Sequence, residues 1–128
     1  MQTQTNKKAM ILFAHGARAA SWVEPFERLQ KITQDRLPDV RVVLAFLELM
    51  TPQLPDVLAG FAVDGVTEIT IVPVFLGQGG HVKRDLPLLV LEAQERYPGM
   101  VINVVEAVGE QVEVLDAIAG YCVGSVRL

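Results

Sequence analysis

Both histidines of this 128-residue chain follow apolar runs that are typical of buried β-strands. His15 follows the run Met10–Ala14, and His81 follows the run Ile69–Phe75 and a short glycine-rich loop. If these strands are parallel, their carboxyl ends lie at one edge of the sheet, where open α/β folds place their ligand sites. The sequence therefore predicts that two imidazoles, distant along the chain, face one cleft.

A carboxylate follows a third apolar run at the corresponding point. The run Val40–Leu47 ends at Glu48, just ahead of a turn that contains Pro52. Two neutral imidazoles and one carboxylate can bind a divalent transition metal or move protons. We therefore predict a shared site of His15, Glu48 and His81. The simpler alternative for either histidine alone is a side chain that only caps its strand.

Positive charge gathers beside both histidines. Arg18 lies three residues after His15, and Lys83 and Arg84 follow His81 closely. The net charge of the whole chain is −4, so the broad basic surface that binds nucleic-acid phosphates is not expected. The local cations predict an anionic ligand at the cleft. Lys83 and Arg84 have an equally simple alternative as a solvated pair near a helix start.

Two other features have weaker chemical interpretations. The glycines of the loop 77–80 could let backbone amides hold a phosphate, but the loop lacks the residues of a P-loop and the spacing of a dinucleotide site. A tight bend that turns His81 toward the cleft is the preferred interpretation. Cys122, the lone cysteine, has no base near it in sequence, so a covalent nucleophilic route is disfavoured.

Four apolar runs and the stretches between them predict the scaffold. The runs, near 9–14, 40–47, 67–75 and 101–105, lack strict alternation, as expected for strands covered on both faces. Their alternation with stretches of helical length is typical of an α/β protein. We expect a single doubly wound parallel four-stranded sheet with helices on both faces. A polar tail over residues 1–8 is expected to precede one domain over residues 9–128.

Capping residues predict where the first two helices begin. Ser21 and Glu24 have the spacing of a capping box, which predicts a helix from there to about Leu37. Thr51 stands before Pro52 as an N-cap stands before a proline in the first turn, which predicts a second helix over about 52–63.

The last two helices are predicted in the same way. Asp85, two residues before Pro87, predicts the start of the third helix, and the turn residues 97–99 predict its end. A final helix over about 110–122 is expected to face the core with one side. The core-facing residues of that helix would be Val112, Leu115, Ile118 and Ala119.

The remaining composition predicts a cytoplasmic protein. No stretch approaches the roughly 20 apolar residues that span a bilayer, and no leader sequence follows the first eight residues. Cys122 cannot form an internal disulfide, which fits a reducing compartment. Because a four-stranded sheet leaves its cleft open on one side, a second copy of the chain could close it.

Three blocks of residues resemble a known family, the short CbiX-type class II chelatases, which are related to the SirB-type sirohydrochlorin chelatases. The blocks are Leu-Phe-Ala-His-Gly-Ala-Arg at 12–18, Ala-Phe-Leu-Glu-Leu at 45–49 before Thr51-Pro52, and Val-Pro-Val-Phe-Leu-Gly-Gln-Gly-Gly-His-Val at 72–82 before Asp-Leu-Pro. The third block is the most specific, and the resemblance extends over about residues 9–120. One departure is Ala17, where the family commonly has a serine.

The resemblance implies ATP-independent insertion of Co²⁺ or Fe²⁺ into sirohydrochlorin, in cobalamin or sirohaem biosynthesis. It implies that His15 and His81 carry the metal and proton chemistry, that Glu48 is the third member, and that no cofactor beyond the substrate metal is needed. It also implies a homodimer whose two copies bound the cleft. Carboxylates on the rim of the substrate would then meet the cations Arg18, Lys83 and Arg84.

Two alternatives from other classes stay open at this point. A tetrapyrrole- or metal-binding carrier of the same fold would use the same ligands with little turnover. A small flavodoxin-like signalling domain with incidental histidines is the other alternative. That second class normally has an acidic cluster at the end of the first strand, where this chain has His15 and Gly16.

Overall fold

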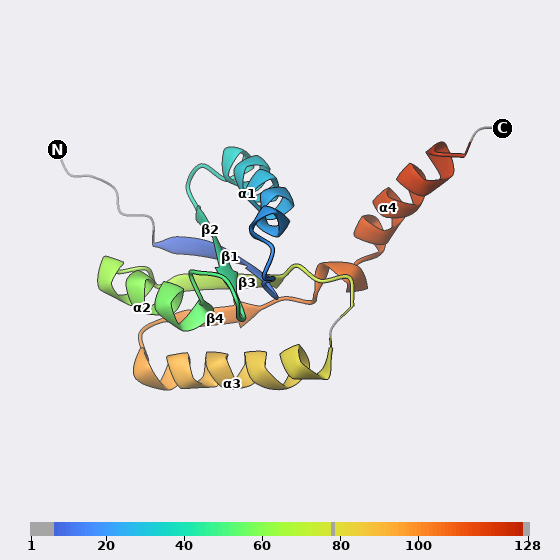
Figure 1. Cartoon of the computed structure of the whole chain (residues 1–128). Helices are drawn as coiled ribbons and strands as arrows, with labels where there is room; N and C mark the ends of the chain where they lie inside the picture. The colour runs from blue at the N-terminus through green and yellow to red at the C-terminus, as the bar shows by residue number, and fades with distance from the viewer. Residues whose placement is uncertain (1–6, 78, 127–128) are drawn as a thin grey trace.

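The computed structural model describes residues 7–77 and 79–126, and of His81 it describes the backbone only. Of the predicted polar tail, residues 1–6 lie outside the described part, and Lys8 already belongs to the first strand. In chain order the elements are β1 (Lys8–Ala14), η1 (Ala20–Val23), α1 (Glu24–Arg36), β2 (Arg41–Phe46), α2 (Leu54–Asp64), β3 (Glu68–Pro73), α3 (Gly80–Arg96), β4 (Val101–Val104), η2 (Val108–Glu110) and α4 (Val112–Gly124) (Figure 1).

The four strands form one parallel sheet in the order β2-β1-β3-β4. At the centre of the sheet, Leu12 of β1 lies between Leu44 of β2 and Val72 of β3. The predicted parallel four-stranded sheet is therefore confirmed. Since all strands run the same way, their carboxyl ends lie at one edge, and the loops that follow β1, β2 and β3 leave the sheet there.

Helices cover both faces of the sheet, as predicted (Figure 1). On one face, α2 and α3 pack on a core that includes Ile11, Phe13 and Ile71, with Leu58 and Phe61 supplied by α2. On the other face, the η1–α1 segment covers β1 and β2. The residues of this second core are Leu12, Ala14, Val42, Leu44 and Phe46, with Trp22, Val23 and Phe26 packed against them.

Two glutamines join the helices to the two edge strands in the same way. Gln34, near the end of α1, accepts a hydrogen bond from the N–H of Val42 (2.9 Å). It also donates one to the carbonyl of the residue two positions before Val42 (2.7 Å). Gln94, near the end of α3, accepts from the N–H of Ile102 (3.2 Å) and donates to the carbonyl two residues earlier (2.6 Å). Each amide thus fixes the first residues of an edge strand to the preceding helix.

The first two helices begin later than the capping signals predict. Ser21 lies in η1, and α1 begins at Glu24, whose N-cap residue makes no side-chain hydrogen bond. The Thr51–Pro52 peptide bond is cis, and α2 begins at Leu54. In both helices the second residue is a proline. Its missing N–H costs no hydrogen bond, because N–H groups in the first turn have no acceptor within the helix.

The third helix begins five residues earlier than predicted. It starts at Gly80, and Pro87 lies inside it, so the interpretation of Asp85 as the cap is wrong. Val82 and Leu86 are both buried against the core and lie one turn apart, so their burial stabilises helical structure ahead of Asp85. The predicted end of this helix at residues 97–99 is confirmed, because α3 ends at Arg96.

The fourth helix departs most from the prediction. Figure 1 shows α4 running away from the sheet, and no residue of α4, all of which the structure describes, is buried. The expected core residues Val112, Leu115 and Ile118 are 65%, 46% and 40% exposed, and Ala119 is exposed as well. The prediction that they face the core of their own chain is wrong. Their apolar spacing is real, but within the described residues it does not pack on either core cluster.

Candidate functional site at the carboxyl edge of the sheet

Two of the three predicted site residues lie together at the carboxyl edge. His15 is the first residue after β1, and Glu48 is the second residue after β2. The Nε2 atom of His15 lies 3.1 Å from the Oε2 atom of Glu48, and the two side chains are 45% and 46% exposed. The pair is thus formed by neighbouring strands and stays accessible to solvent and to a ligand.

The backbone brings these two loops together. The N–H of Leu47 donates to the carbonyl of Ala14 (2.9 Å), and the N–H of Glu48 donates to the carbonyl of His15 (3.1 Å), so the pairing of β1 and β2 continues into the loops. Gly16 has φ +99°, and a Cβ atom built on it would overlap the carbonyl oxygen of Glu48. Glycine is therefore required for this close approach.

Sequence reasoning missed the role of Gly16. The signal was present, because a glycine directly after a candidate histidine at a strand end indicates a backbone position that needs positive φ or a close neighbour. It also missed Leu49, which follows Glu48 with φ +69°, a region that residues with a side chain rarely adopt. Gly16 directly follows His15 and Leu49 directly follows Glu48, so each sets the backbone direction just after one member of the pair.

The arrangement suits proton transfer and metal binding. If Nε2 of His15 carries its proton, it donates to the carboxylate of Glu48, and Nδ1 keeps a lone pair for a proton or a metal ion. A carboxylate that accepts this bond fixes the orientation of the ring. With the proton on Nε2, Glu48 orients the ring of His15 and Nδ1 has the free lone pair.

The backbone of His81 lies in the first turn of α3, after the loop that follows β3. Its side chain lies outside the described residues, so its predicted proximity to His15 and Glu48 stays a prediction. Among the described side chains, which leave out His81, no three His, Cys, Asp or Glu residues are grouped so as to hold a metal. The described pair alone supplies one nitrogen and one carboxylate.

The three predicted cations are on segments that leave the same edge. Arg18 is exposed in the loop between β1 and η1, and Lys83 and Arg84 are exposed in the first turns of α3. The Nε atom of Arg84 lies 3.6 Å from Oδ1 of Asp85, so this guanidinium already has an anionic neighbour. Arg84 would have to give up this contact in order to bind another anion.

An open groove of about 350 Å³ lies on the side of the sheet that α2 and α3 cover. It runs between the start of α2 and the first half of α3, and Leu47, the residue before Glu48, forms part of its wall. Leu88 and Leu89 make the groove largely apolar, and Asp85 places a carboxylate at it. The groove therefore offers an apolar wall that begins one residue from Glu48 along the chain.

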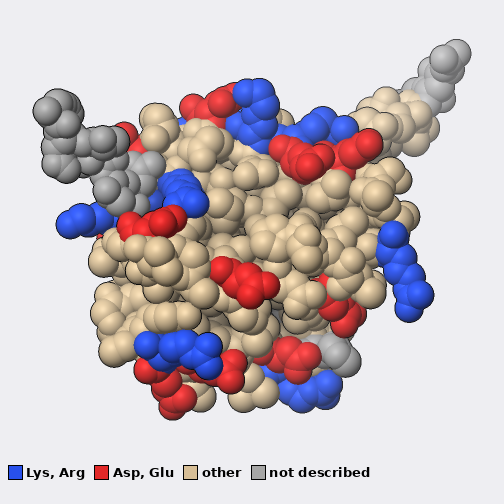
Figure 2. Space-filling model, turned by 60° about the vertical axis from the view of Figure 1, so that its left-hand side comes forward, with Lys and Arg blue, Asp and Glu red and all other residues tan. Residues whose placement is uncertain are grey.

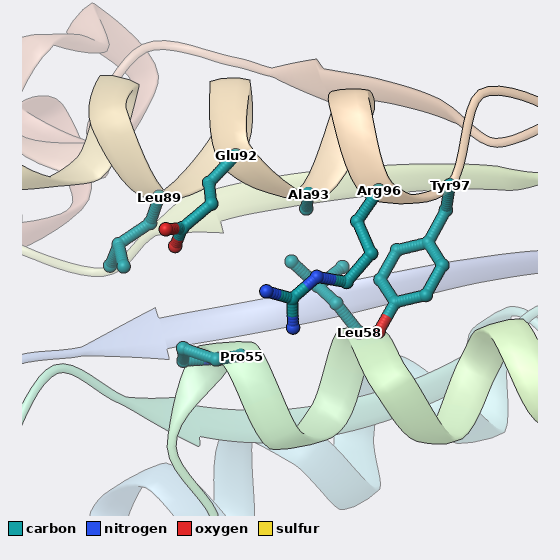
Figure 3. A pocket seen from close by; sticks show the side chains of 7 residues that line it. All are labelled: Pro55, Leu58, Leu89, Glu92, Ala93, Arg96 and Tyr97. Atoms are coloured by element: carbon teal, nitrogen blue, oxygen red, sulfur yellow. The ribbon is translucent and has the colours of Figure 1, made fainter.

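A second pocket lies deeper between α2 and α3 (Figure 3). It holds only about 30 Å³, enough for a water molecule and too little for an organic ligand. Its walls combine apolar carbon with the side chains of Glu92 and Arg96. This pocket belongs to the packing of the two helices, and the groove at the carboxyl edge is the better candidate for a ligand.

The fold and this edge define an open parallel α/β protein with a histidine–carboxylate site at the carboxyl ends of its central strands. The chain belongs to the CbiX family, whose model matches residues 9–120. The expected fold of that family is thus confirmed.

Individual relatives agree with this assignment. The sirohydrochlorin cobaltochelatase of Methanosarcina acetivorans is 35% identical over 83 residues, which are 65% of this chain and 64% of that protein. The crystal structure of a putative cobalamin biosynthesis CbiX protein from Marinobacter aquaeolei is 30% identical, with a TM-score of 0.79 over 90% of this chain and 93% of that one. SirB from Bacillus subtilis with Fe³⁺ is 25% identical, with a TM-score of 0.74, and 88% of this chain covers 45% of SirB.

The described helices include none that is long and apolar enough to cross a membrane.

Proposed function

We propose that the protein inserts a divalent metal ion, Co²⁺ or Fe²⁺, into sirohydrochlorin without ATP. The observation that carries the proposal is the His15–Glu48 pair at 3.1 Å on the carboxyl edge, in a chain that belongs to the CbiX family. The Methanosarcina acetivorans relative is a sirohydrochlorin cobaltochelatase, which supports the substrate and the reaction. The metal ion is a substrate in this reaction and not a resident cofactor.

The chemistry of insertion fits the pair. A metal ion that enters the macrocycle displaces two pyrrole protons, so the site needs bases that work near neutral pH. The free nitrogen of His15 accepts a proton or holds the incoming metal, and Glu48 orients the ring and takes protons onward. Since both side chains are about half exposed, protons can pass to water. His81 completes the donor set in this proposal.

The substrate is expected to use the groove and the cations. The apolar wall of Leu47, Leu88 and Leu89 suits the flat carbon framework of a tetrapyrrole. Carboxylates on the rim of the substrate would bind Arg18, Lys83 and Arg84 through charge-assisted hydrogen bonds. For Arg84 this requires that its contact with Asp85 be exchanged for one with the substrate.

The working form is proposed to be a cytoplasmic homodimer. The groove and the pair are open on one side, and the chain matches only 45% of SirB, so a second copy would supply a comparable mass of protein at the cleft. The lone Cys122 fits a reducing compartment. Cobalt and the cobalamin pathway are favoured by two of the relatives, and the SirB structure with Fe³⁺ keeps iron and sirohaem as the alternative.

An anaerobic absorbance assay tests the proposal. Purified protein is mixed with excess sirohydrochlorin and Co²⁺ or Fe²⁺, and the loss of free sirohydrochlorin is compared with the rate without protein. We expect many turnovers for the natural chain and a rate near background for His15→Ala and His81→Ala, with unchanged circular dichroism. Tight binding of sirohydrochlorin without turnover would replace this proposal by the carrier function, which uses the same residues.

A further inference from the structure

Two exposed leucines lie at the carboxyl edge of the sheet, each on the third residue after its strand. Leu49 follows β2 and is 53% exposed, and Leu76 follows β3 and is 63% exposed. Neither is part of the two cores described above. Since β1 lies between β2 and β3 in the sheet, the two loops flank the end of β1, where His15 follows. Apolar side chains are thus present on both sides of the candidate site.

The loop after β2 passes over the edge from one core to the other. Leu47 packs against the core under α2 and α3, and Met50 packs against the core under α1. Between them, Glu48 meets His15, and Leu49 is left exposed. The two middle residues of this turn therefore stay outside both cores, with the carboxylate directly before the apolar side chain.

Leu49 has a backbone conformation that favours a different type of residue. Its φ of +69° lies in the left-handed region, where glycine is unstrained and a leucine is not. The loop is held closed by the hydrogen bond from the N–H of Phe46 to the carbonyl of Pro52 (2.9 Å). Glycine or asparagine would make the same turn at a lower cost. Because the leucine gains no burial in a core, a contact with a ligand would supply the missing compensation.

The loop after β3 is held in place by η2. Val74 packs against the core under α1 and Phe75 against the core under α2 and α3, so Leu76 is the first residue of this loop outside both. The N–H of Gly109 in η2 donates to the carbonyl of Phe75 (2.9 Å). A Cβ atom built on Gly109 would overlap the backbone of Leu76. The backbone of Leu76 is therefore fixed while its side chain stays exposed.

We propose that Leu49 and Leu76 bind the flat carbon face of the macrocycle, one on each side of His15. This inference rests on the proposed function and adds two substrate-contact residues to it. The ends of β2 and β3 are two strand spacings apart, which is roughly 10 Å. A ligand that contacts both leucines must therefore reach across the end of β1, where His15 stands. A large flat ring can do so, and a small ligand cannot.

Charge alone does not select the place of the substrate. On the face that Figure 2 shows, the described Lys and Arg side chains lie beside Asp and Glu side chains and do not gather into one basic patch. The carboxylates of the substrate thus find no surface of a single sign there. Apolar contacts at the carboxyl edge supply an attraction that does not depend on charge. The affinity that the two leucines contribute is therefore expected to persist at high salt.

A titration of sirohydrochlorin without metal, followed by absorbance at low and at high salt, tests the contact. Leu49→Ala and Leu76→Ala should each raise Kd about 10-fold, and the double variant about 100-fold, with the same ratios at both salt concentrations. Leu91→Ala is the matched control. Leu91 is 56% exposed in the second half of α3, away from the carboxyl edge, so this variant should bind like the natural chain.

Two further variants separate binding from folding at Leu49. Glycine accepts φ +69° without strain, so Leu49→Gly should keep or raise Tm while its Kd rises as in Leu49→Ala. Leu49→Met keeps an apolar side chain of similar volume and should bind within about 2-fold of the natural chain. A lower Tm for Leu49→Gly with an unchanged Kd would show a purely structural residue and overturn the inference for Leu49.

The titration and the insertion assay separate this inference from the proposed function. In the insertion assay the leucine variants should raise KM and keep kcat, because neither side chain can accept a proton or bind a metal. If the natural chain turns over and the variants bind as it does, the inference fails and the chelatase stands. If the natural chain binds without turnover and the variants bind about 10-fold more weakly, the inference holds and the carrier function replaces insertion. A natural chain that does not bind sirohydrochlorin would overturn both.

Discussion

Replacing Gly16 by alanine is expected to damage stability and activity together. The change adds one methyl group at φ +99°, and this methyl overlaps the carbonyl oxygen of Glu48, well inside the 3.0 Å that real Cβ atoms keep from heavy atoms. Either the loop after β1 or the loop after β2 must move. Since the His15–Glu48 pair joins these loops, the movement reaches the site directly.

The magnitude follows from two contributions. A left-handed backbone costs a residue with a Cβ about 1–2 kcal/mol, and loss of the hydrogen bond from the Glu48 N–H to the His15 carbonyl costs about 1 kcal/mol. The resulting destabilisation of about 2–3 kcal/mol would lower Tm by roughly 10 °C in a domain of this size. A displacement of about 1 Å at the pair is expected to lower kcat about 100-fold.

Gly65→Ala is the matched control. Gly65 ends α2 with φ +79°, and a Cβ atom there would meet nothing within 4 Å, so this variant carries the backbone cost without the overlap. Thermal unfolding and the anaerobic insertion assay are measured on both variants. Gly65→Ala should lose roughly 5 °C and keep its turnover. If Gly16→Ala matches this control in both measurements, the close approach of the two loops does not constrain the site.

Three further changes have defined outcomes. Glu48→Gln keeps the shape of the side chain and removes its charge, so insertion should fall about 10- to 100-fold, whereas Glu68→Gln at the opposite edge should leave the rate unchanged in the same assay. Reversing the charges of Lys83 and Arg84 to glutamate should raise KM more than it lowers kcat, and an equal effect on both would contradict a binding role. Leu58→Ala removes a fully buried side chain and should cost about 3 kcal/mol in urea unfolding; a loss below about 1 kcal/mol would mean that the core relaxes around it.

The sheet could be predicted from sequence because its apolar runs are short, bounded by turns and free of alternation. The same reasoning brought His15 and Glu48 to one edge, since both follow strand ends that proved to be neighbours. The start of α3 could not be predicted from Pro87, because the burial of Val82 and Leu86 outweighs the missing N–H of one proline. The residue types around Pro87 do not reveal this burial, because it depends on contacts made only in the folded core.

The last helix shows a different limit. The spacing of Leu115 and Ile118 correctly indicates a face that needs covering, but periodicity does not say what covers it. The prediction assumed the core of the same chain. In the same way, the role of Gly16 depends on the carbonyl of Glu48, which is 32 positions away along the chain and close only after β1 and β2 have paired.

The two glutamine clamps have a consequence for self-association. A sheet edge with unpaired N–H and C=O groups is a template on which foreign strands add, and open edges of this kind lead to aggregation. The amides of Gln34 and Gln94 each present one acceptor and one donor to an edge strand, as an added strand would. They thereby occupy the first positions on β2 and β4 from which a cross-β ladder would grow. A foreign strand that adds at the start of β2 or β4 would therefore have to displace a glutamine amide first.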